Sequence, residues 1–183
     1  MSESLPVTLD LHRLREGIPA LTHAMGSVHA ECAAVCLDNQ KHGISTDIRV
    51  QTSSGKTYRI VRPAVTAQMI RTYDDLQDAT ELGASGVALL LAREETGLTA
   101  IQRSRKGTGF DYWLGPDNQN DDELPFQRSA RLEVSGILKG TDNQVTARIR
   151  QKLRQTDPSD GLRLSAYAVV VEFGQPMAQI SKK

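Results

Sequence analysis

Asp111 and Glu133 are the two acidic residues whose setting most favours chemistry. Asp111 lies in residues 110–114 and Glu133 in residues 131–138, two segments whose alternation predicts consecutive β-strands. Neighbouring strands can bring two carboxylates close enough to share one divalent cation, and Mg²⁺ accepts such ligands while keeping several waters. A cation held there can activate water and stabilise charge on phosphorus. The pair therefore predicts hydrolysis of a phosphodiester.

The elements that must position this pair follow from the apolar periodicity of the C-terminal half. A helix is predicted over residues 79–95, with Gly97 as its stop, and a second helix runs from a cap at Asp142 to about Gln155. Strands are predicted in residues 98–105, 110–114, 131–138 and 167–173. The glycines inside the first helix could permit close packing on a sheet.

The order of these elements predicts an α/β fold with a mixed β-sheet flanked by helices. It reads helix, three strands, helix, strand, and the second helix links two strands as a βαβ crossover does. Alternation in the third strand separates two sets of residues on opposite faces. They are Arg131, Glu133 and Ser135 on one face, and Leu132, Val134 and Gly136 on the other.

Residues 1–78 are predicted to form an N-terminal extension, and residues 79–183 the core. Apolar residues recur every three or four positions in residues 18–39, which indicates an amphipathic helix. Two β-rich runs in residues 47–62 surround a four-residue turn and predict a hairpin. A short helix follows in residues 65–76. We expect this helix-hairpin-helix segment to pack on the sheet, lie at its edge or form a partner surface, within one compact unit.

The composition is that of an ordinary soluble protein. The 183 residues include 22 basic and 22 acidic side chains, so any affinity for nucleic acid must come from local patches. The N-terminus has no signal-peptide pattern, and no apolar stretch has transmembrane length. We therefore expect a cytoplasmic protein without a membrane partner, whose Cys32 and Cys36 are reduced.

Two segments of the C-terminal half resemble the core of PD-(D/E)xK nucleases, especially the Holliday-junction-resolvase and Mrr-like branches. They are LLAREETGLTAIQRSRKGTGFDYWL in residues 90–114 and RLEVSGI in residues 131–137. In that family a helix ends in glycine, a strand follows, a Gly-rich turn leads to the metal-binding aspartate, and the next strand carries Glu-x-Lys. The resemblance implies a restriction-endonuclease-like αβββαβ core and a DNA endonuclease of a bacterial restriction or defence type.

The resemblance also implies roles for particular residues. Asp111 and Glu133 take the positions of the metal-binding carboxylates, with Mg²⁺ or Mn²⁺ as cofactor, and Glu81 is the candidate for a helix glutamate that some branches add. Ser135 stands where the family has its lysine. Lys106 in the preceding turn, or Lys139 beyond the strand, could supply the missing amine beside the catalytic set of Asp111, Glu133 and Ser135.

Basic residues near the predicted site could contact the phosphates of nucleic acid, expected to be DNA. One group flanks the Gly-rich turn and the other lies on the helix after Glu133. The members are Arg103, Arg105, Lys106, Arg148 and Lys152. For the helix group, solvated charge explains the same pattern, because a helix with a buried stripe needs polar residues elsewhere.

Alternatives remain at this point. The missing lysine and zero net charge favour an inactive nuclease-fold subunit that binds nucleic acid or a protein partner in a larger assembly, and a homo-oligomer is also open. The acidic segment 117–123 could bind a basic protein. Finally, His29, Cys32 and Cys36 share one helical face and suit zinc, although buried thiols in a core stripe show the same spacing.

Overall fold

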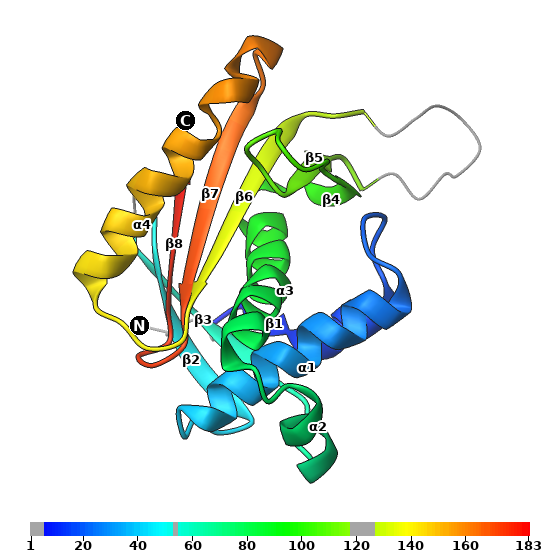
Figure 1. Cartoon of the computed structure of the whole chain (residues 1–183), viewed down its shortest axis with the longest axis vertical. Helices are drawn as coiled ribbons and strands as arrows, with labels where there is room; N and C mark the ends of the chain where they lie inside the picture. Colours follow the sequence, from blue (N-terminus) through cyan, green and yellow to red (C-terminus); the bar gives the residue numbers. More distant parts are fainter. Residues whose placement is uncertain (1–5, 53–54, 118–126) are drawn as a thin grey trace, which may run out of the picture.

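The chain folds around one mixed sheet of eight strands, in a computed structural model that describes residues 6–52, 55–117 and 127–183. The strands lie across the sheet in the order β1-β3-β2-β8-β7-β6-β5-β4 (Figure 1). Their bounds are Thr8–Asp10 for β1, Ser45–Gln51 for β2, Lys56–Val61 for β3, Thr99–Arg103 for β4, Tyr112–Gly115 for β5, Ala130–Ile137 for β6, Ser165–Glu172 for β7 and Met177–Lys182 for β8.

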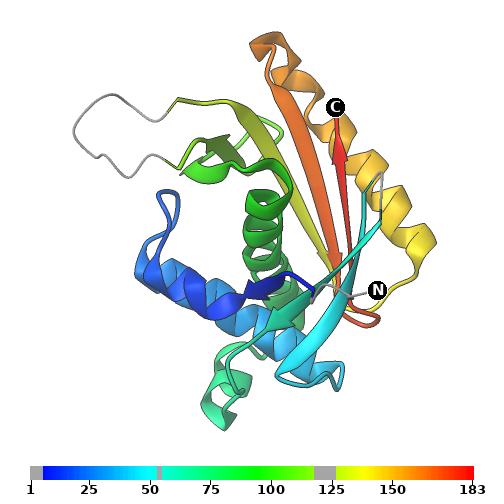
Figure 2. The same cartoon turned by 180° about the vertical axis from the view of Figure 1, so that it is seen from behind.

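Helices cover the two faces of the sheet unequally (Figures 1 and 2). Helix α3 packs on β6 and β7, α1 packs on α3, and α4 lies on the opposite face over β6, β7 and β8. The helices are η1 (Leu11–Glu16), α1 (His23–Asn39), α2 (Ala67–Thr72), α3 (Leu76–Thr96), α4 (Asp142–Gln155) and η2 (Asp157–Leu162). Within the described ranges, no helix combines the length and apolarity that crossing a membrane requires.

The predicted order of the C-terminal half is present. Helix α3 is followed by β4, β5 and β6, which pair antiparallel, and α4 then leads to β7, which lies parallel to β6. The two faces of β6 are also as predicted. Leu132 and Val134 join the large apolar cluster with α3, whereas Glu133 and Ser135 contact α4.

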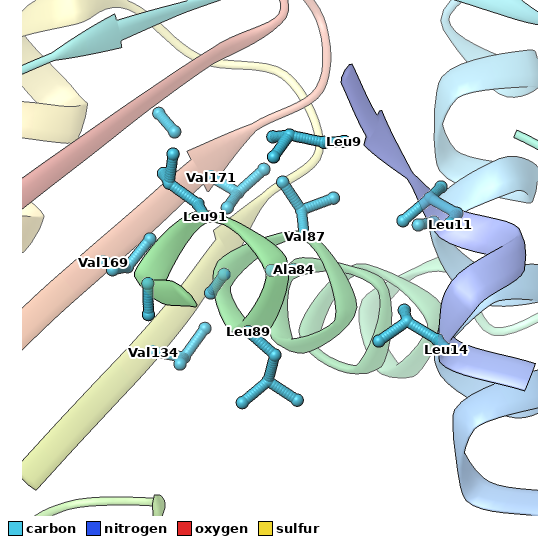
Figure 3. Packing of buried hydrophobic residues seen from close by; sticks show 14 of the residues in the cluster. Leu9, Leu11, Leu14, Ala84, Val87, Leu89, Leu91, Val134, Val169 and Val171 are labelled. Carbon is cyan, nitrogen blue, oxygen red and sulfur yellow. The ribbon is translucent and has the colours of Figure 1, made fainter. Parts of the chain in front are cut away.

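The N-terminal hairpin of β2 and β3 lies toward one edge of this sheet, which is one of the expected positions, and lengthens it. Strand β8, which periodicity did not predict, pairs antiparallel with β7 and parallel with β2, and so joins the hairpin to the rest. Both halves of the chain also share one core. Figure 3 shows Val87 and Leu91 of α3 among Leu9 of β1 and Val169 and Val171 of β7.

Two local predictions about the helices are wrong. The cap of α4 is Thr141, not Asp142, because the Thr141 hydroxyl accepts the Gln144 amide hydrogen and the Gln144 side chain accepts that of Thr141. The glycines of α3 face helix α1, not the sheet. A Cβ at Gly83 would lie 2.7 Å from the backbone nitrogen of Ala33, so glycine is required for this close approach.

Candidate functional site

Asp111 and Glu133 line one cavity of about 530 Å³, the arrangement predicted from the sequence. The cavity lies between the β4–β5 turn and the C-terminal end of α4, where Gln155 forms part of its wall. Arg105 and Lys106 of the turn also line it and are exposed. The cavity therefore has acidic groups at its base and basic groups at its rim.

The backbone of β6 holds Asp111 in place. Strand β5 begins one residue later, at Tyr112, so Asp111 precedes the strand in which it was predicted. Its backbone nitrogen nevertheless donates to the Leu132 carbonyl oxygen at 2.8 Å, and its Oδ2 accepts the Val134 amide hydrogen at 2.8 Å. These two bonds orient the carboxylate toward the neighbouring position, Glu133.

Glu133 is buried, with 6% of its surface exposed, and its pKa is raised to about 7. Burial is the largest cause, because it disfavours the charged form, and the negative charge of Asp111 adds to it. Lys152 of α4 acts in the opposite direction: its Nζ donates to Glu133 Oε1 at 2.7 Å. The two carboxyl groups thus form a site with more negative charge than one lysine offsets.

Ser135 is also buried under α4, and its Oγ accepts a hydrogen bond of 2.9 Å from Nη1 of Arg148. The Arg148–Ser135 and Lys152–Glu133 contacts have the same spacing along the helix and along the strand. Arg148 and Lys152 are one turn apart on a helix, which is about 6 Å, and Ser135 and Glu133 are two positions apart on a strand, about 6.6 Å. The basic pair on α4 is therefore matched to β6, which simple solvation of the helix does not explain.

The structure does not bring Glu81 to this site. Glu81 is exposed on α3, and α3 covers the opposite face of the sheet from Glu133. Among the residues that the structure describes, no group of three or more His, Cys, Asp or Glu side chains is arranged to hold a metal ion. Asp111 and Glu133 thus stand as a pair of carboxylates.

The remaining basic candidates divide between the two sides of the sheet. Arg103 lines the cavity, but its guanidinium lies 5.6 Å from the ring centroid of Tyr112, on the α3 side. Lys139, the other candidate for the missing amine, packs beside Gly174 of the β7–β8 turn, at the far end of β6. Lys106 is therefore the better placed of the two candidate lysines, and Lys152 is a third that periodicity did not reveal.

The β4–β5 turn is fastened to α4. A Cβ at Gly109 would lie 2.0 Å from the Gln155 carbonyl oxygen, and Gly109 has a φ of 81°, so no larger residue fits without displacement. The hydroxyls of Ser104 and Thr108 are hydrogen bonded to each other across the turn. This packing sets the position of Lys106 relative to the two carboxylates.

Larger cavities lie elsewhere in the described ranges, among them two of about 720 Å³ and one of about 610 Å³. Of the two largest, one borders Tyr167 and the end of α3, and the other lies between η1 and the C-terminal half of α3. Volume alone does not select a site. The cavity of about 530 Å³ is the one in which paired carboxylates, a raised carboxyl pKa and exposed basic residues at the rim occur together.

The zinc alternative gains no support from the buried helix stripe. Burial raises the pKa of Cys32 to about 12 and that of Cys36 to about 11, and Cys36 Sγ lies 3.7 Å from Thr80 Oγ1. His29 is fully buried between α1 and α3.

Of the acidic segment, Asp117 is paired with Arg93 at 2.6 Å, and residues 118–123 lie outside the described ranges.

A scan against protein-family models gives no match for this chain. Comparison with the curated proteins and with the solved structures gives no match either. The assignment of a function to the site therefore depends on its geometry and chemistry.

Proposed function

We propose that this protein hydrolyses phosphodiester bonds of nucleic acid, expected to be DNA, with the help of a divalent cation. The observation that carries the proposal is the placement of Asp111 and Glu133 in one cavity whose rim bears Arg105 and Lys106. The sequence of α3, β4, β5, β6, α4 and β7 supports a restriction-endonuclease-like core around it.

The residues of the cavity suit Mg²⁺ or Mn²⁺. Mg²⁺ is commonly bound through one or two carboxylates together with retained waters, which is what Asp111 and Glu133 can provide. The raised pKa of Glu133 has its second cause in the Asp111 charge, a repulsion that a bound cation relieves. When bound, such a cation supplies Lewis acidity and an activated water.

The protein's own residues supply binding and orientation. Arg105 and Lys106 are exposed at the cavity rim, where they can bind the phosphates on either side of the scissile bond. The bond from Val134 fixes the Asp111 carboxylate. Ser135 is not assigned a direct contact with the substrate, because its hydroxyl accepts a hydrogen bond from Arg148.

The test is a cleavage assay on supercoiled, linear and branched DNA with Mg²⁺ or Mn²⁺. Asp111→Asn and Glu133→Gln should each reduce the rate by at least about a hundredfold, because each removes charge that holds the cation. Glu81→Gln is the matched control, since it removes a carboxylate from α3 on the other face of the sheet. Equal losses in all three variants would contradict the assigned pair.

A second candidate function is a catalytically inactive subunit that binds nucleic acid or a protein partner. Lys152 and Arg148 favour it, because they satisfy the two polar positions of β6 without any cation. Wild-type protein that is inert with every metal, yet binds DNA with a steep salt dependence, would establish this function. Absence of both DNA and metal binding would leave a protein-interaction role.

A further inference from the structure

Helix α4 carries a lysine whose position the proposed hydrolysis does not explain. Lys152 contacts Glu133 at 2.7 Å, and the side chains of the two residues are only 18% and 8% exposed. Other lysine–carboxylate pairs in the described ranges, such as those of Lys56 and Lys183, are more exposed. A partly desolvated pair of this kind is a poor source of stability, so stability alone does not account for it.

We propose that Lys152 is an internal competitor of the divalent cation for Glu133. In the metal-free protein its ammonium group holds the Glu133 carboxylate, and binding of the cation displaces it from that carboxylate. This inference rests on the proposed function, because it requires that Asp111 and Glu133 bind a cation.

Electrostatics makes the two occupants of Glu133 compete. A cation ligated by Glu133 would lie within a few ångströms of the Lys152 ammonium, which is bonded to that same carboxylate. Because Glu133 is largely buried, the resulting repulsion is screened less than at an exposed site. The cation therefore weakens the bond between the ammonium and the carboxylate and favours release of the ammonium.

The fold allows the side chain to move while the helix stays. Val145 and Ile149 of α4 are buried against Ala168 and Val170 of β7, so the helix itself is anchored. The lysine side chain has four rotatable bonds and can swing without disturbing this contact. Arg148 differs from Lys152 because, within the described ranges, it bonds the Ser135 hydroxyl and no carboxylate.

Cation binding also changes the charge of the site in the direction that the substrate needs. With Asp111 and Glu133 ionised, the two carboxylates and Lys152 together carry one net negative charge, which repels a phosphodiester. With a divalent cation added, the same groups carry one net positive charge, which attracts it. Cation binding thus prepares the cavity for an anionic substrate.

The test is the affinity of the full chain for Mn²⁺ at pH 8, measured by the electron paramagnetic resonance of free Mn²⁺. Lys152→Met should bind Mn²⁺ about tenfold more tightly than the wild type, because the competing charge is gone. Arg148→Met, one turn earlier on the same helix, should change the affinity by less than about twofold. Glu133→Gln should lose most of the affinity for Mn²⁺.

Each outcome decides a different claim. Unchanged or weaker binding by Lys152→Met, with Glu133→Gln impaired, overturns the competitor and leaves the proposed metal site standing. Equal tightening by Arg148→Met overturns it too, since general charge would then be the cause. Unchanged binding by Glu133→Gln removes the site itself and the competitor with it.

A measurement on the wild type covers the case in which Lys152→Met does not fold. The ¹³Cε signals of the lysines can be followed by NMR during titration with Mg²⁺, with Lys152→Arg used only to assign the signal. The Lys152 signal should shift with saturation of the site, whereas that of Lys139, at the far end of β6, should not. A Lys152 signal that stays in place at saturating Mg²⁺ overturns the inference.

Discussion

The two faces of strand β6 are both buried, yet they are built from different chemistry. Toward α3 the strand presents Leu132 and Val134, which join a continuous apolar core. Toward α4 it presents Glu133 and Ser135, each bonded to a basic side chain. The adjacent strand β7 shows that α4 can pack on apolar residues, because Val145 and Ile149 do so there. Polar residues under α4 are therefore not demanded by folding, and this difference points to function.

The largest expected effect sharpens this contrast at two positions of one strand. Leu132→Ala should destabilise the protein by about 2–5 kcal/mol, because it leaves a cavity in the core under α3. Ser135→Ala removes a single hydrogen bond to Arg148 and should lower stability by about 1 kcal/mol. Urea denaturation of both variants measures the difference. Equal losses would mean that the α4 face is as important for folding as the α3 face.

A buried histidine on the α3 side should also make the stability of the protein sensitive to acid. Burial, with a smaller contribution from Arg103, lowers the pKa of His29 to about 4, and neither ring nitrogen has a hydrogen-bond partner among the residues that the structure describes. The unfolded chain binds a proton near pH 6.5 while the folded chain does not. Stability from this residue is thus present above pH 6.5 and is lost as the pH falls toward 4, with about 2 kcal/mol lost by pH 5.

Thermal or urea unfolding at pH 7 and pH 5 checks this expectation against His29→Gln. The variant should lose less stability than the wild type over the same interval, because its side chain does not titrate. The same loss in both proteins would show that other groups cause the acid sensitivity.

A smaller effect is expected in the turn that closes the cavity. Gly107 and Gly109 both have positive φ, so alanine strains the backbone at either position. Only at Gly109 would the added Cβ meet Gln155, whereas at Gly107 it meets nothing within 4 Å. Gly109→Ala should therefore be less stable than Gly107→Ala by about 1 kcal/mol or more, as measured by denaturation. A reversed order would show that the turn is not packed on α4.

Local patterns predicted much of the architecture and part of the site. The alternation of residues 131–138 placed Glu133 and Ser135 on one face, and the strand order brought Asp111 beside Glu133. Strand β8 escaped prediction because its sequence, MAQISK, is short and half polar, and its pairing with β2 is long-range. The outward position of Glu81 depends on how α3 is rotated, which a helix with weak amphipathicity does not reveal.

The roles of Arg148 and Lys152 show the same limit for long side chains. At about 100° per residue, Lys152 lies on the same side of α4 as Val145, seven positions earlier, and Arg148 lies beside that stripe, so only their charge indicated solvation. Their contacts with Ser135 and Glu133 depend on the register between α4 and β6, which only the packed structure provides. A helix following a strand, with basic residues one turn apart facing polar residues two positions apart, is a signal that could have been sought.

The central claim is that Asp111 and Glu133 hold one divalent cation together. A double-mutant cycle on Mn²⁺ affinity, with Asp111→Asn, Glu133→Gln and the combined variant, tests it most directly. We predict that each single change removes most of the affinity and that the combined change weakens binding little further, since both carboxylates serve one ion. Independent, additive effects, or Mn²⁺ binding that neither change alters, would contradict the claim.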